Sequence, residues 1–312
     1  MREVANAPTD QVVSYLDDVF VFSDNPDLMR GIQNLFAAPP RGQHDDGLRL
    51  NLTKTTTKDF MMVASGGLGI KALGSMVGSR EERSAFLRAK VDDLGADRGR
   101  LRQLPKQHAL LLLRACFAPR LTHLLRTMDT GDLEDELDRL DKLIRDMMDH
   151  LRGAPAGVGC CGTTQRIYSL PISLGGCGLA NYAELREAAR SSCRERSQHF
   201  LLGKGVPIPG PHPLVEVGAD GLLPPLPTSQ KVRAMAVYKA DLLDFLKHMT
   251  EDERTAFHDN GGQVGSAWLH AIPSGKYRAL TDRQVVVGLN VRCLKPDLQG
   301  RARCRACGNV TS

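Results

Sequence analysis

The chain has 312 residues, 42% of them hydrophobic and 25% charged, with a formal net charge of +5. This composition is typical of a globular protein of about two domains, and the mild positive charge allows nucleic-acid binding without requiring it. No apolar run approaches the roughly 20 residues of a membrane span, and the polar opening MREVANAPTD lacks the apolar segment of a secretory signal. We therefore expect an intracellular protein, cytoplasmic or nuclear, without a membrane partner. The eight cysteines are dispersed, which argues against a disulfide scaffold.

Two β-rich runs near the N-terminus predict a hairpin. They cover residues 12–16 and 19–22, and Asp17 and Asp18 stand at the break between them. Adjacent carboxylates at the tip of an otherwise apolar hairpin repel one another unless they bind a cation, and Mg²⁺ prefers such oxygen ligands. Taken alone, the pair also fits an ordinary turn that ends two strands.

The remainder of the chain has mostly helical patterns. Ser79 and Glu82 predict a helix start, and Pro119 should kink or split the helix in which it stands. The stretch 203–227 is rich in proline and is expected to be irregular. Apolar residues recur at helical spacing after Pro26 and over residues 79–104, 106–128, 133–151, 182–202, 231–249, 251–259 and 280–292.

Five segments, in this order, resemble the palm and thumb of reverse transcriptases of the non-LTR retrotransposon type. Tyr15–Asp18 is similar to the family's Tyr-x-Asp-Asp hairpin, and residues 47–55 (GLRLNLTKT) to its G-L-x-L-N-x-x-K-T segment. Residues 72–78 (ALGSMVG) resemble its L-G-x-x-x-G turn, and residues 107–126 its Q-x-A-L-x-L-L-R thumb helix. Residues 170–179 resemble L-P-x-x-x-G-G-L-G-L, with Cys177 in place of a leucine. The likeness covers about residues 10 to 200.

This resemblance implies an α+β chain, in which a partial polymerase palm, made of a β-hairpin and a helix, precedes a mostly helical thumb-like and C-terminal region. The expected parts are a partial reverse-transcriptase palm over 1–78 and a helical thumb-like region over 79–152. A connector over 153–230 would hold the Gly-rich turn, a helix and the Pro-rich stretch. A helical C-terminal region with a basic tail would cover 231–312.

The resemblance also implies roles for single residues. Asp17 and Asp18 would bind Mg²⁺, of which the intact family uses two ions for nucleotidyl transfer, and Lys54 would stabilise charge near the triphosphate. The nucleic-acid contacts would come from Tyr15, Leu73 and Gly74. The partners would then be an RNA template and a DNA primer.

One departure from the family lies before the hairpin. The family's polymerases need a third carboxylate from an earlier palm strand and a fingers region, and fourteen residues precede Tyr15 here. Neither Glu3 nor Asp10 stands in a strand pattern that fits the missing role. We therefore expect a fragment of an RNA-directed DNA polymerase, a nucleotidyltransferase in the intact parent, that does not polymerise by itself. A non-catalytic nucleic-acid-binding or scaffold remnant is the alternative, and a reading frame without a function of its own is a third.

The C-terminal tail carries half of a zinc site. Cys304 and Cys307 form a C-x-x-C-G knuckle, whereas Zn²⁺ takes four ligands and Cys293 is the one further Cys or His nearby. We therefore expect no bound zinc. Phosphates or solvent are the expected neighbours of the arginines around the knuckle, which include Arg301, Arg303 and Arg305.

Overall fold

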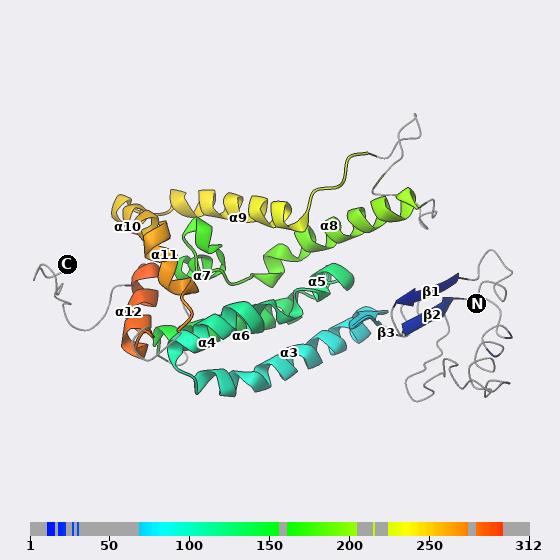
Figure 1. Ribbon diagram of the computed structural model, residues 1–312, viewed down its shortest axis with the longest axis horizontal. Helices are drawn as coiled ribbons and strands as arrows, with labels where there is room; N and C mark the ends of the chain where they lie inside the picture. The colour runs from blue at the N-terminus through cyan, green and yellow to red at the C-terminus, as the bar shows by residue number, and fades with distance from the viewer. Residues whose placement is uncertain are drawn as a thin grey trace, which may run out of the picture. The chain divides into compact units, whose positions relative to one another are not determined.

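The computed structural model describes residues 11–15, 18–22, 27, 30, 69–155, 161–204, 215, 224–273 and 279–295 (Figure 1). The chain divides into two compact units, Met1–Ile70 and Lys71–Ser312. The described part is mostly helical, with two small antiparallel hairpins, so the α+β prediction holds at this level. None of the helices within the described ranges is long and apolar enough to cross a membrane.

The first unit contains the predicted N-terminal hairpin. Strand β1 (Gln11–Tyr15) pairs with β2 (Asp18–Phe22) in antiparallel register, and Gln11 stands opposite Phe22. The hairpin is confirmed, with one difference: Asp18 opens the second strand, opposite Tyr15, instead of lying between the strands. The helix predicted after Pro26 falls outside the described residues, apart from the helical positions Asp27 and Arg30.

The second unit opens with a short hairpin and a long helix. Strands β3 (Ile70–Ala72) and β4 (Ser75–Val77) form the strand turn expected from residues 72–78. Helix α3 (Arg80–Arg102) follows directly. The Ser79 hydroxyl accepts a hydrogen bond from the backbone N–H of Glu82, which satisfies one of the free amides of the first turn. The predicted helix start is thus confirmed.

The second predicted helix is divided, as Pro119 led us to expect. It consists of α4 (Lys106–Leu112), a π-helical turn over Leu113–Phe117, a 3₁₀ turn over Ala118–Leu121 and α5 (Leu124–Thr127). Proline has no N–H to donate to the carbonyl four residues earlier, and its ring would clash with that carbonyl. The third predicted helix is continuous: α6 (Glu134–Arg152) ends at Gly153, whose φ of 77° places it in the left-handed region.

The C-terminal half contains six helices within the described ranges. Four match the prediction closely: α8 (Tyr182–Gly203), α9 (Gln230–Lys247), α10 (Glu251–Gly261) and α12 (Asp282–Arg292). Two were not predicted: α7 (Gly162–Ser169) and α11 (Gln263–His270). Both are short and have weak local patterns, so packing decides their conformation; Ile167 and Tyr168 in α7, and Leu269 in α11, are fully buried.

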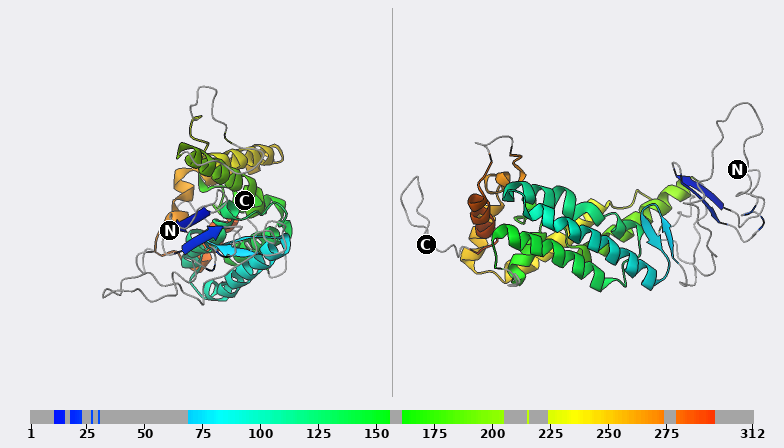
Figure 2. Two further views of the ribbon diagram at one scale, coloured as in Figure 1. Left: turned by 90° about the vertical axis from the view of Figure 1, so that its right-hand side faces the viewer. Right: turned by 90° about the horizontal axis from the view of Figure 1, so that it is seen from below.

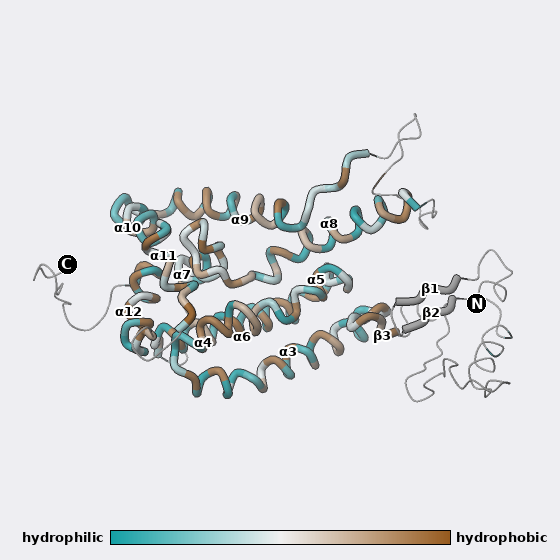
Figure 3. The backbone as a smooth tube through the Cα atoms, viewed as in Figure 1, coloured by the Kyte–Doolittle hydropathy of each residue, from teal (hydrophilic) through white to brown (hydrophobic). Residues whose placement is uncertain are grey.

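The long helices of this unit pack as a series. α3 lies against α6, α6 against α8, and α8 against α9. Figures 1 and 2 show these four helices running roughly along one direction, with α10, α11 and α12 crossing one end of the series. In Figure 3, brown and teal segments alternate along α3 and α6, as expected for amphipathic helices around a shared core. Leu87, Leu140 and Ile144 are among the buried residues at that interface.

The N-terminal end of α4 is tied to the C-terminal helices by hydrogen bonds between residues that are far apart in sequence. The buried Gln107 side chain donates to the Ala271 carbonyl over 3.3 Å and accepts from the Leu280 backbone N–H over 2.7 Å. The Lys106 backbone N–H donates to the Asp282 carboxylate over 2.8 Å. Since α4 also belongs to the core, these bonds attach the last helices to the centre of the unit.

Asp141 joins α6 to the start of α8. Its carboxylate accepts from the backbone N–H groups of Tyr182 (2.8 Å) and Ala183 (3.1 Å), and its exposed fraction is 3%. Burial raises the pKa of Asp141 to about 6, and the two hydrogen bonds offset that rise only in part.

This raised pKa predicts a pH dependence of stability. Between an unfolded-state value of about 4 and the folded-state value, the folded protein binds more protons than the unfolded chain, so its stability falls as pH rises through that window. We expect Asp141→Asn to remove about 2–3 kcal/mol of this fall, at 1.36 kcal/mol per pKa unit. Urea unfolding between about pH 4 and pH 7 measures it. The exposed Asp135→Asn should keep the wild-type slope, and an equal slope in Asp141→Asn and wild type would contradict the prediction.

Candidate functional site

The tip of the β3–β4 hairpin has an unusual backbone conformation. Leu73 has a φ of 49° and Gly74 a φ of 76°, so both central residues of the two-residue turn are left-handed. Glycine takes this conformation readily, whereas a leucine there costs about 1 kcal/mol. Leu73 is 52% exposed, so burial of its side chain does not compensate for the strain. A strained and exposed apolar residue on a turn is a candidate for contact with a ligand.

The hairpin tip lies beside the start of α5. A Cβ built on Gly74 would stand 3.9 Å from Nε2 of His123, which is exposed at the N-terminal end of that helix. Lys71 and Val77 are exposed on the two strands of the same hairpin. The tip therefore presents a cation, two apolar side chains and an imidazole on neighbouring segments.

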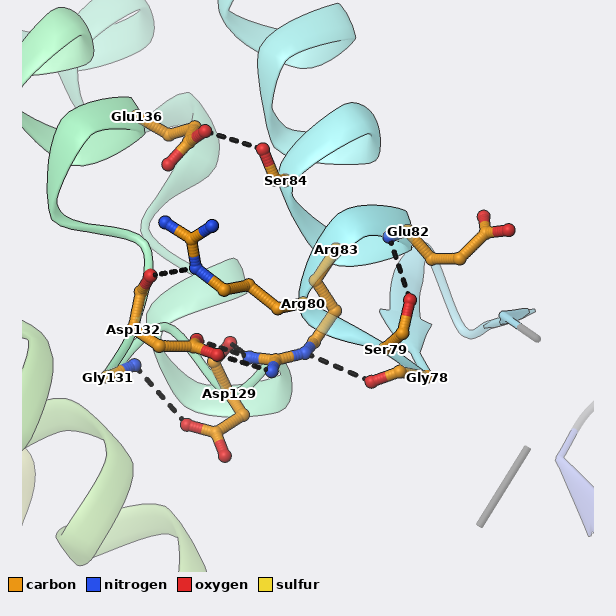
Figure 4. Close-up of polar contacts among 10 residues, drawn as sticks. All are labelled: Gly78, Ser79, Arg80, Glu82, Arg83, Ser84, Asp129, Gly131, Asp132 and Glu136. Carbon is orange, nitrogen blue, oxygen red and sulfur yellow. Dashed lines mark hydrogen bonds and ion pairs between the residues drawn. The ribbon is translucent and has the colours of Figure 1, made fainter. Parts of the chain in front are cut away.

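An arginine at the base of the hairpin ties it to the helices (Figure 4). Arg83, on the first turn of α3, donates two bonds of 2.8 Å to the carboxylate of Asp132, just before α6. Its Nε donates to the Gly78 carbonyl over 3.1 Å, and Nη1 donates to the Asp129 carbonyl. The hydrogen bonds from Arg83 hold the pKa of the Asp132 carboxyl below its usual value. The end of the hairpin is thus fixed against both helices.

A second set of bonds continues along the same interface. The buried Glu136 on α6 accepts from the hydroxyl of Ser84 over 2.5 Å and from Nε of Arg88 over 3.0 Å. Arg80 donates from Nε to the Asp132 carbonyl over 3.0 Å. Four consecutive turns of polar contact therefore hold α3 in one orientation relative to α6, and the direction of the hairpin follows from it.

The Gly-rich turn singled out in the sequence is a structural centre. Within it, the Cys177 N–H donates to the Ile167 carbonyl over 2.8 Å, and the Gly178 N–H to the Leu170 carbonyl over 2.9 Å. Arg292 of α12 donates from Nε and Nη2 to the Gly176 carbonyl over 2.9 and 2.7 Å. Cys177 is fully buried, so it takes the place of the family's leucine as a small apolar residue.

The structure describes four of the residues that the sequence singled out. Tyr15 and Asp18 are opposite one another in β1 and β2, and Leu73 and Gly74 form the tip of the second hairpin. The others lie outside the described residues: Asp17, Lys54, Arg301, Arg303, Cys304, Arg305 and Cys307. No group of three or more His, Cys, Asp or Glu side chains suited to a metal ion occurs in the part of the chain that the structure describes. The Mg²⁺ sites and the absence of zinc remain predictions.

Sequence reasoning did not find the residues that support the tip. Arg83 and Asp132 are 49 positions apart, and no local spacing connects them. The one available signal was the L-G-x-x-x-G resemblance, which located Leu73 and Gly74 but not their strain or their tether.

Comparison with known proteins gives one relevant similarity. Over 197 residues, the chain is 25% identical to the retrotransposable element SLACS 132 kDa protein of Trypanosoma brucei gambiense. The chain is similar to a retrotransposon protein. The alignment covers 61% of this chain and 16% of the SLACS protein, so the chain spans a small part of that relative. No family model and no solved structure matches the chain.

Proposed function

We propose that this chain is part of a retrotransposon reverse transcriptase, and that its second unit is the thumb side that holds the primer and template. The similarity to the SLACS retrotransposon protein supports the proposal, as does the order of the five family-like segments. The observation that carries it in the structure is the tethered hairpin with an exposed, strained leucine at its tip.

The chemistry of the hairpin suits the end of a nucleic-acid strand. The apolar Leu73 side chain would pack on a sugar or base, and the exposed Lys71 would attract the phosphates. The Arg83 tether makes the position of this contact reproducible, which matters because misplacing a primer end by about 1 Å slows transfer strongly. In the intact parent, Asp17 and Asp18 would hold the Mg²⁺ ions that stabilise charge on the transferred phosphate.

The role of Leu73 predicts opposite effects on binding and stability. Leu73→Asn should weaken binding of an RNA–DNA primer–template hybrid about fivefold, because an apolar contact is lost. The same change should raise the free energy of unfolding by about 0.5–1 kcal/mol, since asparagine tolerates positive φ. Fluorescence anisotropy measures the first effect and urea unfolding the second. Val264→Asn, at an exposed valine of α11, is the matched control and should leave the affinity unchanged.

Polymerisation and binding alone are separated by primer extension. Mg²⁺-dependent extension that disappears on Asp17→Ala would assign the chemistry to this chain. Hybrid binding without extension, unchanged by Asp17→Ala, would support the non-catalytic alternative. If the chain binds no hybrid, or if Leu73→Asn and Val264→Asn bind it equally well, the thumb assignment is wrong.

A further inference from the structure

A groove lies where α5, the second half of α8 and the start of α9 meet. It has a volume of about 720 Å³ and is open to solvent. Cations, hydroxyl groups and an aromatic ring gather in it. The lining residues include Arg126, Ser192, Arg196, Phe200, Ser229 and Lys231.

The segment before α9 is held along α8 by a row of side chains. Ser192 donates to the Thr228 carbonyl over 3.0 Å, Arg196 donates to the Pro227 carbonyl over 3.2 Å, and His199 is 2.9 Å from the Pro224 carbonyl. These three residues are four and three positions apart, so they share one face of α8. The bonds fix the Pro-rich segment and thereby bring the N-terminal end of α9 to the groove.

The first turn of α9 has unused hydrogen-bond donors. The Ser229 hydroxyl at the N-cap position makes no capping bond. Among the described residues, no acceptor faces the backbone N–H groups of Gln230 and Lys231. Free amides and the positive end of the helix dipole attract anions.

The cations of the groove are not neutralised by carboxylates. Within the described ranges, Arg126, Arg196 and Lys231 have no Asp or Glu partner. Arg126 donates from Nε to the side-chain oxygen of Gln230, which leaves its Nη groups available. Neighbouring arginines differ: Arg233 pairs with Glu195, and Arg186 with Glu134. The groove therefore has a local excess of positive charge that suits phosphates.

An aromatic ring lines the same groove. Phe200 is 62% exposed, which is unusual for a phenylalanine in a folded domain. Nζ of Lys204 lies 5.8 Å from its ring centroid. An exposed ring beside unpaired cations is the arrangement on which unpaired bases stack while cations follow the phosphates.

We propose that this groove binds single-stranded nucleic acid. The phosphates contact Arg126, Lys231 and the first amides of α9, and a base stacks on Phe200. A single strand fits better than a duplex because the bases of a duplex already stack on one another and hide their faces. The inference deepens the proposed function and rests on it, but it concerns a surface separate in sequence from the Leu73 hairpin.

The test uses an oligouridine of about 12 nucleotides and the full chain, with fluorescence anisotropy over a range of salt concentrations. The double variant Arg126→Gln/Lys231→Gln should weaken binding at least tenfold and lower the salt dependence by about 1.4, or about 0.7 for each phosphate contact. Phe200→Leu should weaken binding at least fivefold and leave the salt dependence unchanged, because stacking involves no counterion. Thermal unfolding confirms that each variant is folded.

The matched control removes the same charge elsewhere. Arg283→Gln/Lys239→Gln replaces two exposed cations of α12 and α9 and should reduce oligouridine affinity less than threefold. Equal losses in the two double variants would mean diffuse attraction and would overturn the proposal. Groove-dependent binding of vesicles that contain an acidic phospholipid, without oligouridine binding, would also overturn it.

The two functional proposals fail separately. Each variant is tested on oligouridine and on the primer–template hybrid. If groove variants lose only oligouridine while Leu73→Asn has no effect on the hybrid, the groove stands and the hairpin assignment falls. If groove variants bind oligouridine like the wild type, the groove proposal is wrong whatever the hybrid shows.

Discussion

Gly176→Ala is expected to destabilise the protein by about 4 kcal/mol or to prevent its folding. A Cβ at this position would stand 2.0 Å from the Leu170 carbonyl oxygen and 2.4 Å from the carbonyl carbon, which are backbone atoms that cannot move aside. Relief requires the turn to open, and this breaks the Gly178-to-Leu170 hydrogen bond and displaces the carbonyl that Arg292 binds. Urea unfolding followed by circular dichroism measures the loss.

Gly99→Ala is the matched control for this change. Gly99 is an exposed residue in the middle of α3, and a Cβ there would meet nothing within 4 Å. Because alanine favours the helix, this variant should gain about 0.5–1 kcal/mol. If Gly176→Ala unfolds at the same urea concentration as the wild type, the close approach to Leu170 does not exist in solution.

Arg292→Met should cost about 3 kcal/mol. The Arg292 side chain is 1% exposed and forms three hydrogen bonds, two to the Gly176 carbonyl and one of 2.6 Å to the Asn260 carbonyl. Methionine fills similar space but leaves both carbonyls buried without donors. The effect should appear as lower protection of the Gly-rich turn and α10 in hydrogen exchange, and as a lower free energy of unfolding.

Arg283→Met tests whether the loss of Arg292 acts through these bonds. Arg283 is exposed on the same helix, so its replacement removes the same charge and should change stability by less than about 0.5 kcal/mol. Similar destabilisation in the two variants would show that the charge of α12 matters, and not the carbonyl contacts of one residue.

Local signals predicted much of this fold. Ser79 and Glu82 marked the start of α3, and the missing N–H of Pro119 predicted the division of the second helix. The same reasoning did not find α7, because Gly162, Thr163 and Thr164 are weak helix formers. That helix forms because Ile167 and Tyr168 are buried against other segments, and burial of this kind has no signature in a short sequence window.

The candidate site was less accessible to sequence reasoning. Leu73 and Gly74 were found through their resemblance to a family motif, and a leucine at positive φ is not what turn preferences predict. The groove residues Arg126 and Lys231 are 105 positions apart on different helices, and their shared surface depends on how α8 directs the chain toward α9. Only the packed structure brings these charges together.

The long-range bonds of α4 have a consequence for protein synthesis. Gln107 reaches Ala271 and Leu280, which are 164 and 173 positions later, and Lys106 reaches Asp282, 176 positions later. At about 5–20 residues per second, a ribosome takes roughly 10–30 seconds to make the partners of these side chains. During that time the buried amide of Gln107 and the apolar residues beside it have no permanent cover. The nascent helix is therefore the part of the second unit with the longest wait, and a chaperone that binds this chain during translation is expected to do so there.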